Sequence, residues 1–70
     1  MRPLTAKKLI CVLIANGFIL ARQKGSHAIY RHHSDGIIVP VPLHGKNEPI
    51  HIGTFLAIVK QSKIPLAKFK

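Results

Sequence analysis

Two prolines separated by one residue, Pro40 and Pro42, constrain the fold more than any other feature of this chain. They fall in and just after residues 37–41, whose isoleucines and valines are typical of a strand. Proline has no backbone N–H, so a strand that contains it cannot donate hydrogen bonds along both of its sides. We therefore expect this strand at an edge of its sheet.

Two further strands precede it. Residues 18–23 and 27–33 alternate as strands do, with tight turns expected at residues 24–26 and 34–36. Three consecutive hairpin-linked strands form a meander, in which the last strand lies at an edge. The turn pattern and the prolines thus predict the same sheet.

A helix is expected before these strands. Thr5 can cap its N-terminus and Gly17 can supply the left-handed stop after about Asn16. Its apolar stripe is expected to bury Leu9, Ile10, Leu13 and Ile14, with Lys7 and Lys8 exposed. In the first strand, Phe18 and Leu20 are expected to face inward and Ile19 outward.

A second helix is expected from about Ile52 or Gly53 to Gln61, with a tail at residues 64–66 that packs back. The resulting fold class is α+β, in the order α-β-β-β-α: a three-stranded antiparallel meander with two helices on one face. This outline is that of a double-stranded-RNA-binding domain. We expect residues 1–70 to form a single domain.

Residues 1–21 resemble a secretory signal, with a basic head and an apolar middle. Asn16 and Gly17 interrupt that middle, and Pro3 and Thr5 are typical of a helix start, so a structural helix is favoured. The apolar run is also shorter than the roughly 20 residues needed to span a bilayer, and we expect no membrane partner. Cys11 is the only cysteine, which suits a reducing cytoplasm, and it is expected to be buried.

The charge indicates the kind of partner. Eleven Lys and Arg face two acidic residues, giving a net charge of +9. Such a surface attracts polyanions. Nucleic acid is favoured over a charge that serves solubility alone, and over a lipid surface.

The alternation of a strand places His27, Ile29 and Arg31 on one face, with Ala28 and Tyr30 on the other. Tyr30 is then expected in the core, and His27 at the first position of the exposed row. A histidine by itself is more often a hydrogen-bonded structural residue than a catalyst. Its neighbours favour the catalytic interpretation here.

The amides of Gly25 and Ser26, with the Ser26 hydroxyl, could form a small anion-binding concavity before His27. Lys24, Arg22 and Arg31 lie near it along the chain and could hold a phosphate. A phosphodiester of RNA suits this arrangement, because the 2′-hydroxyl is a nucleophile attached to the substrate itself. An imidazole can transfer the protons at neutral pH, and no metal or other cofactor is required.

The other histidines are harder to assign. His32 and His33 adjoin a turn and are expected to be solvated, whereas His44 and His51 lie in or next to a basic loop. His44 or Lys46 is a candidate second proton carrier. A zinc site is disfavoured, because the chain has one cysteine and two acidic residues to complete a ligand set.

Three segments, ARQKGSHAIYRH, VPVPLHGK and IGTFLAIVKQ, resemble the HicA toxin family, in that order and over nearly the whole chain. The resemblance implies a double-stranded-RNA-binding-like fold and cleavage of mRNA. It also implies that the histidine of the G-S-H-x-x-Y/F stretch, here His27, is catalytic. The implied partner is a HicB-type antitoxin that covers the active face in a toxin–antitoxin complex.

The chain departs from the family at three positions. Ala28 stands where many relatives carry a second histidine, Leu56 where a basic residue is usual, and Lys63 where a late glycine is usual. Leu56 makes the second helix apolar on more than one side. Either an exposed strip there meets the antitoxin or a second copy, or the tail at Leu66 and Phe69 covers it.

Two alternatives to a nuclease remain open. One is an RNA-binding module of the same fold without catalysis, and the other is a protein-binding partner whose enzymatic site is degenerate.

Overall fold

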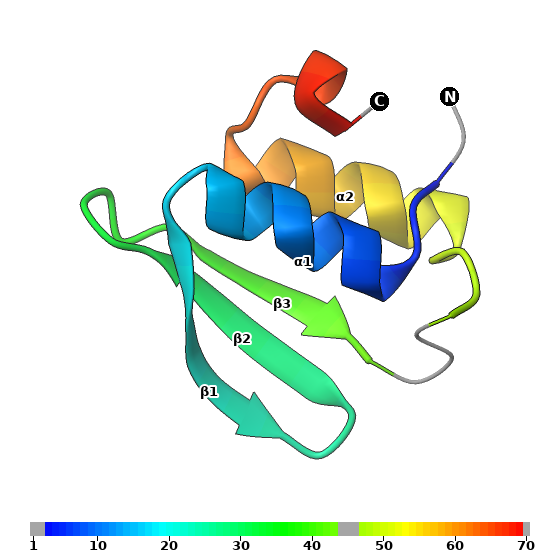
Figure 1. Ribbon diagram of the computed structural model, residues 1–70, viewed down its shortest axis with the longest axis horizontal. Coiled ribbons are helices and arrows are strands. Elements are labelled where there is room, and N and C mark those ends of the chain that lie inside the picture. The colour runs from blue at the N-terminus through cyan, green and yellow to red at the C-terminus, as the bar shows by residue number, and fades with distance from the viewer. Residues whose placement is uncertain (1–2, 44–46, 70) are drawn as a thin grey trace.

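The computed structural model describes residues 3–43 and 47–69, and it confirms the order α-β-β-β-α (Figure 1). The elements are α1 (Ala6–Ala15), β1 (Phe18–Lys24), β2 (His27–His32), β3 (Ile38–Pro42), α2 (Ile52–Ser62) and a final 3-10 helix, η1 (Leu66–Phe69). Both neighbouring strand pairs are antiparallel, and the sheet order is β1-β2-β3. Within the residues described, no helix is long and apolar enough to cross a membrane.

The edge position of β3 follows from its prolines, as the sequence predicts. Pro40 pairs with Ile29 and Pro42 with His27. Because β3 has a neighbour on one side only, the missing N–H groups cost the sheet no ladder bond. The Gln61 side chain of α2 donates to the Ile38 carbonyl at 2.6 Å and so covers part of the free edge.

The two ends of α1 are set by local signals. The Thr5 hydroxyl accepts a hydrogen bond from the Lys8 N–H at 3.3 Å, which satisfies one of the free donors of the first turn. At the other end Asn16 caps the helix, and Gly17 follows with a φ of +93°. Both ends lie where the sequence predicts them.

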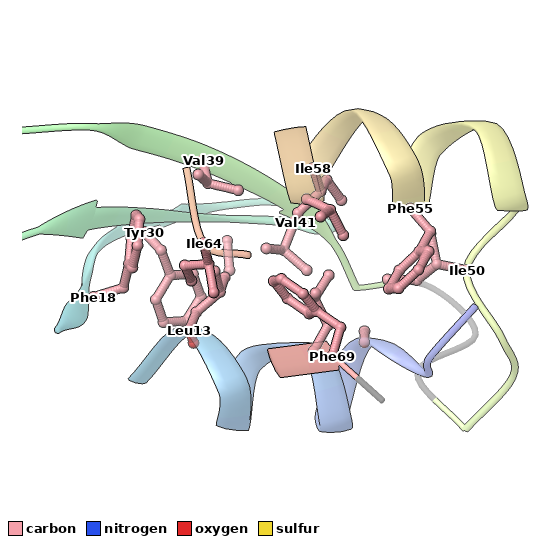
Figure 2. Packing of buried hydrophobic residues seen from close by; sticks show 14 residues of the cluster. Leu13, Phe18, Tyr30, Val39, Val41, Ile50, Phe55, Ile58, Ile64 and Phe69 are labelled. Carbon is pink, nitrogen blue, oxygen red and sulfur yellow. The ribbon is translucent and has the colours of Figure 1, made fainter. Parts of the chain in front are cut away.

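The helices lie on one face of the sheet and enclose the core (Figures 1 and 2). The core also receives residues from the loop before α2 and from the C-terminal tail. Its buried hydrophobic residues are Ala6, Leu9, Leu13, Phe18, Ala28, Tyr30, Val39, Val41, Ile50, Phe55, Ile58, Val59, Ile64 and Phe69. Tyr30 is therefore a core residue, as predicted, and burial, followed by the nearby Cys11, raises the pKa of its hydroxyl.

The tail covers part of the apolar surface of α2. Phe69 of η1 packs edge-on against Phe55, with ring centroids 6.0 Å apart (Figure 2). Leu66 is also expected to cover this helix, but its side chain is 42% exposed, and Leu56 of α2 remains 45% exposed. Phe55, Ile58 and Val59 of α2 are buried, whereas Leu56 and Ile52 remain exposed.

Three residues expected in the core are exposed. In α1 the buried positions are Ala6, Leu9 and Leu13, so Ile14 is 56% exposed and Cys11 is exposed too. Both lie away from the sheet-facing side, because the buried stripe is narrower than the sequence suggests. In β1 only Phe18 is buried, and Leu20 is 51% exposed. The cause is visible in Figure 1, where β1 runs away from the two helices.

His32 is a structural residue, which corrects the expectation that it is solvated. Its ring packs edge-on against Phe18 at 5.1 Å, and its Nδ1 accepts from the Asp35 N–H at 3.1 Å and the Ser34 N–H at 3.3 Å. Side chains alternate between the two faces along a strand, so His32 lies on the helix-facing side of β2 together with Ala28 and Tyr30. His33 is exposed, as expected, and stacks on His32 at 4.8 Å.

Gly17→Ala should destabilise the protein more than Gly36→Ala. Both glycines have a positive φ, +93° and +72°, at which alanine costs about 1–2 kcal/mol. A Cβ on Gly17 would in addition meet Nε2 of His32 at 2.7 Å, a ring that Phe18 and the turn hold in place. At Gly36 the nearest atom is 3.8 Å away.

Thermal unfolding of the two variants measures the difference. We expect Gly17→Ala to have the lower Tm by at least about 4 °C, the shift that corresponds to roughly 1 kcal/mol in a domain of this size. Equal losses in Tm would show that the His32 ring yields without cost.

Candidate active site

The open face of the sheet, which the helices do not cover, carries His27 and the predicted phosphate-binding cations. Residues paired across antiparallel strands share a face. His27 lies between Lys24 of β1 and Pro42 of β3, and Ile29 lies between Arg22 and Pro40. A third row places Arg31 between Ile19 and Ile38.

An irregularity in β1 puts two of these cations on the open face. Leu20 pairs with Tyr30 on the helix side, and the next pair is Arg22 with Ile29, so Ala21 is an extra residue in β1. Regular alternation would have put Arg22 on the same side as Leu20. The bulge at Ala21 instead turns Arg22 and Lys24 to the side of His27.

The open face is electrostatically positive. Lys24, Arg22 and Arg31 are all exposed, and the three strands contain no acidic residue. Such a face attracts an extended polyanion, since exposed like charges on one surface add to a common field. The structure therefore brings the three predicted cations onto the same face as His27.

The β1–β2 turn holds Gly25 and Ser26 beside His27. Gly25 has a φ of +58° with open space where a Cβ would stand, and Ser26 is exposed. The Ser26 carbonyl accepts from the Leu43 N–H at 2.6 Å, which ties this turn to the end of β3. Both residues lie at the end of the sheet where His27 begins β2.

His27 is exposed and lines a cleft of about 460 Å³ at this end of the sheet. The cleft lies between β2, the edge strand β3 and the segment that leads into α2. Its lining residues are His27, Pro40, Pro42, Glu48, Pro49, Ile50, His51 and Thr54. A cleft of this volume can accept a small ligand or a segment of a larger one.

His51 is a second histidine in the same cleft. It is the N-cap of α2, and its Nδ1 accepts a hydrogen bond from the Gly53 N–H at 3.2 Å. The sequence places His51 only in or next to a basic loop, and its candidates for a second proton carrier are His44 and Lys46. His44 and Lys46 lie outside the residues that the structure describes. The one feature of the sequence that points to His51 is its position directly before the predicted start of the second helix, where capping residues lie.

No metal site is found in the described part of the chain. Within residues 3–43 and 47–69, no three His, Cys, Asp or Glu side chains are placed to hold one ion. Nδ1 of His32 lies 3.6 Å from Oδ2 of Asp35, and this nitrogen already accepts hydrogen bonds within its turn.

One comparison with known proteins gives a match. The family model described as the HicA toxin of bacterial toxin–antitoxin systems matches residues 6–64. This range contains both long helices and all three strands, and with them His27 and His51. No curated protein matches the chain.

The open face should bind polyanions more strongly than the helical side does. We expect the Arg22→Gln/Lys24→Gln double variant to bind single-stranded poly(U) RNA more weakly than the wild type. Each lost phosphate contact should also reduce the slope of log affinity against log salt concentration by about 0.7.

The matched control is the Lys7→Gln/Lys8→Gln variant, which removes the same charge from exposed positions on α1. Its affinity for RNA should fall less, because this variant changes only the net charge of the protein and leaves the open face intact. Equal losses in both variants would contradict a binding surface on the open face. Fluorescence anisotropy at several salt concentrations measures the affinities.

Proposed function

The chain belongs to the HicA toxin family, and from this premise we propose that it is an endoribonuclease that cleaves mRNA, with His27 as its catalytic residue. Its membership of this family makes it the toxin of a toxin–antitoxin system. The observation that carries the nuclease proposal is the position of His27. Its ring is exposed, lines a cleft and shares the open face with Lys24, Arg22 and Arg31.

In the proposed reaction the 2′-oxygen of a ribose attacks the adjacent phosphorus. His27 takes the proton from the 2′-hydroxyl, the bond from phosphorus to the 5′-oxygen breaks, and the His27 imidazolium gives the proton to that oxygen as it leaves. The products are a 2′,3′-cyclic phosphate and a 5′-hydroxyl. The nucleophile belongs to the substrate, so the reaction requires no metal ion to generate one.

The cations of the open face stabilise the substrate and the transition state. Lys24 is the cross-strand partner of His27, and it lies next to the Gly25–Ser26 turn. Its charge and that of Arg22 offset the negative charge that grows on the phosphate oxygens during attack. Arg31, two rows away, would hold the RNA backbone farther along the sheet.

A toxin of this family acts with an antitoxin partner. We propose that the partner is a HicB-like protein that covers the open face and forms a hetero-complex with the toxin in the cytoplasm. The two isoleucines beside Arg31 support this. Ile19 is 57% exposed and Ile38 is 51% exposed, so the cationic face also offers apolar area to a protein partner.

His27→Ala should retain the fold and RNA binding but lose cleavage, by a factor of about 10²–10⁴ in kcat. His33→Ala is the matched control, because His33 is also an exposed histidine but follows the end of β2 that is far from His27. Gel analysis of a labelled RNA in EDTA gives the rates. Cleavage by His27→Ala at the wild-type rate would refute the assignment.

The termini of the products identify the reaction. Mass spectrometry should find 2′,3′-cyclic phosphate and 5′-hydroxyl ends, whereas a 3′-hydroxyl with a 5′-phosphate would exclude attack by the 2′-oxygen. Salt-dependent binding with no products at all would favour the non-catalytic RNA-binding module. Growth arrest on expression, relieved by the antitoxin, would contradict a degenerate enzymatic site.

A further inference from the structure

The tautomer of His51 is set by the start of α2. Its Nδ1 accepts from the Gly53 N–H at 3.2 Å, and a ring nitrogen accepts only when it carries no proton. In the neutral ring the proton is therefore on Nε2. No described residue forms a hydrogen bond with that Nε2–H.

The position of His51 is set by the residue before it. Ile50 is buried at 8% exposure, and its N–H donates to the Leu4 carbonyl at 2.9 Å. Pro49 forms an isolated antiparallel bridge with Thr5. The segment that carries His51 is thus attached to the core and to the N-terminal segment on one side, and to α2 on the other.

His51 and His27 line the same cleft from different elements, β2 and the start of α2. Glu48 lines this cleft as well, and its carboxylate repels a phosphate. A phosphate in the cleft therefore needs N–H groups to offset that repulsion. The Nε2–H of His51 can meet this need, and the Thr54 hydroxyl is a further donor among the lining side chains.

We propose that His51 is a second catalytic residue that donates from Nε2 to a non-bridging oxygen of the phosphate under attack. This inference rests on the proposed function and adds a second residue to the same site. His27 transfers the proton, while His51 keeps its own proton and stabilises the charge that develops on the oxygen. A neutral imidazole at a helix N-terminus can polarise a substrate oxygen in this way.

His51→Ser separates the two roles of this residue. Serine can cap α2 as histidine does, but its hydroxyl is too short to replace Nε2–H in the cleft. We expect a Tm near that of the wild type and a KM for RNA that changes little. We expect kcat to fall at least tenfold, because the donor matters most when charge builds up on the oxygen.

A stereochemical test detects the hydrogen bond itself. Two RNA oligonucleotides carry sulfur in place of either the pro-R or the pro-S oxygen at the cleaved linkage. Sulfur is a weak acceptor, so the wild type should cleave one of them more slowly than the other. In His51→Ser this difference should shrink toward unity, because the donor that senses the oxygen is gone. His33→Ala should keep the wild-type difference.

The outcomes separate this inference from the proposed function. Wild-type kcat in His51→Ser, or a lower kcat with an unchanged ratio between the two sulfur substrates, overturns the role of His51 and leaves His27 as assigned. If the wild type cleaves no RNA, the proposed function fails and this inference fails with it.

Discussion

The pairing of β1 with β2 on either side of Ala21 is the constraint on which the candidate site depends. Before the bulge, Leu20 is aligned with Tyr30, and after it Arg22 is aligned with Ile29. The alternation of a strand has a period of two, so one extra residue reverses the face of every residue that follows. Two cations thereby join His27, at the cost of local regularity in one edge strand.

The bulge is tolerated because the helices cover little of β1. Phe18 is the one β1 residue that is buried, and the rest of the strand is exposed. A bulge beneath a packed helix would displace core side chains, whereas here it moves residues that solvent already surrounds. The core is concentrated on β2, β3 and the two helices, and this leaves the β1 end of the hairpin available for binding. Fold stability thus depends on the helix-facing side of the sheet, and the candidate site lies on its open face.

Local signals made most of the fold predictable. Thr5 and Gly17 bound the first helix, the prolines place β3 at the edge, and parity along β2 separates Tyr30 from His27. These features depend on backbone chemistry that neighbours in the sequence determine.

The features that could not be predicted depend on tertiary context. Nothing in FILARQK marks Ala21 as an extra residue, because a bulge is a property of a pair of strands. Exposure of Leu20, Ile14 and Cys11 depends on how far each helix reaches across the sheet. His51 could be placed near His27 only once β3 and the start of α2 were seen to enclose one cleft. His27 could therefore be chosen as a candidate catalyst from the sequence, whereas the position of His51 in the same cleft could not be predicted from it.

The uncharged early turns of α2 give the open face more importance for the proposed function. In α2, Leu56 is 45% exposed, and Ile52 one turn earlier is 40% exposed. Lys60 is the one cation within α2, and it lies in the last turn, away from His51 at the first. Because the early turns of α2 carry no charge, the proposed attraction of RNA toward the cleft relies on cations outside this helix, among them Lys24, Arg22 and Arg31 on the open face. The bulge that turns two of these side chains toward His27 is therefore as necessary to the proposed chemistry as the imidazole itself.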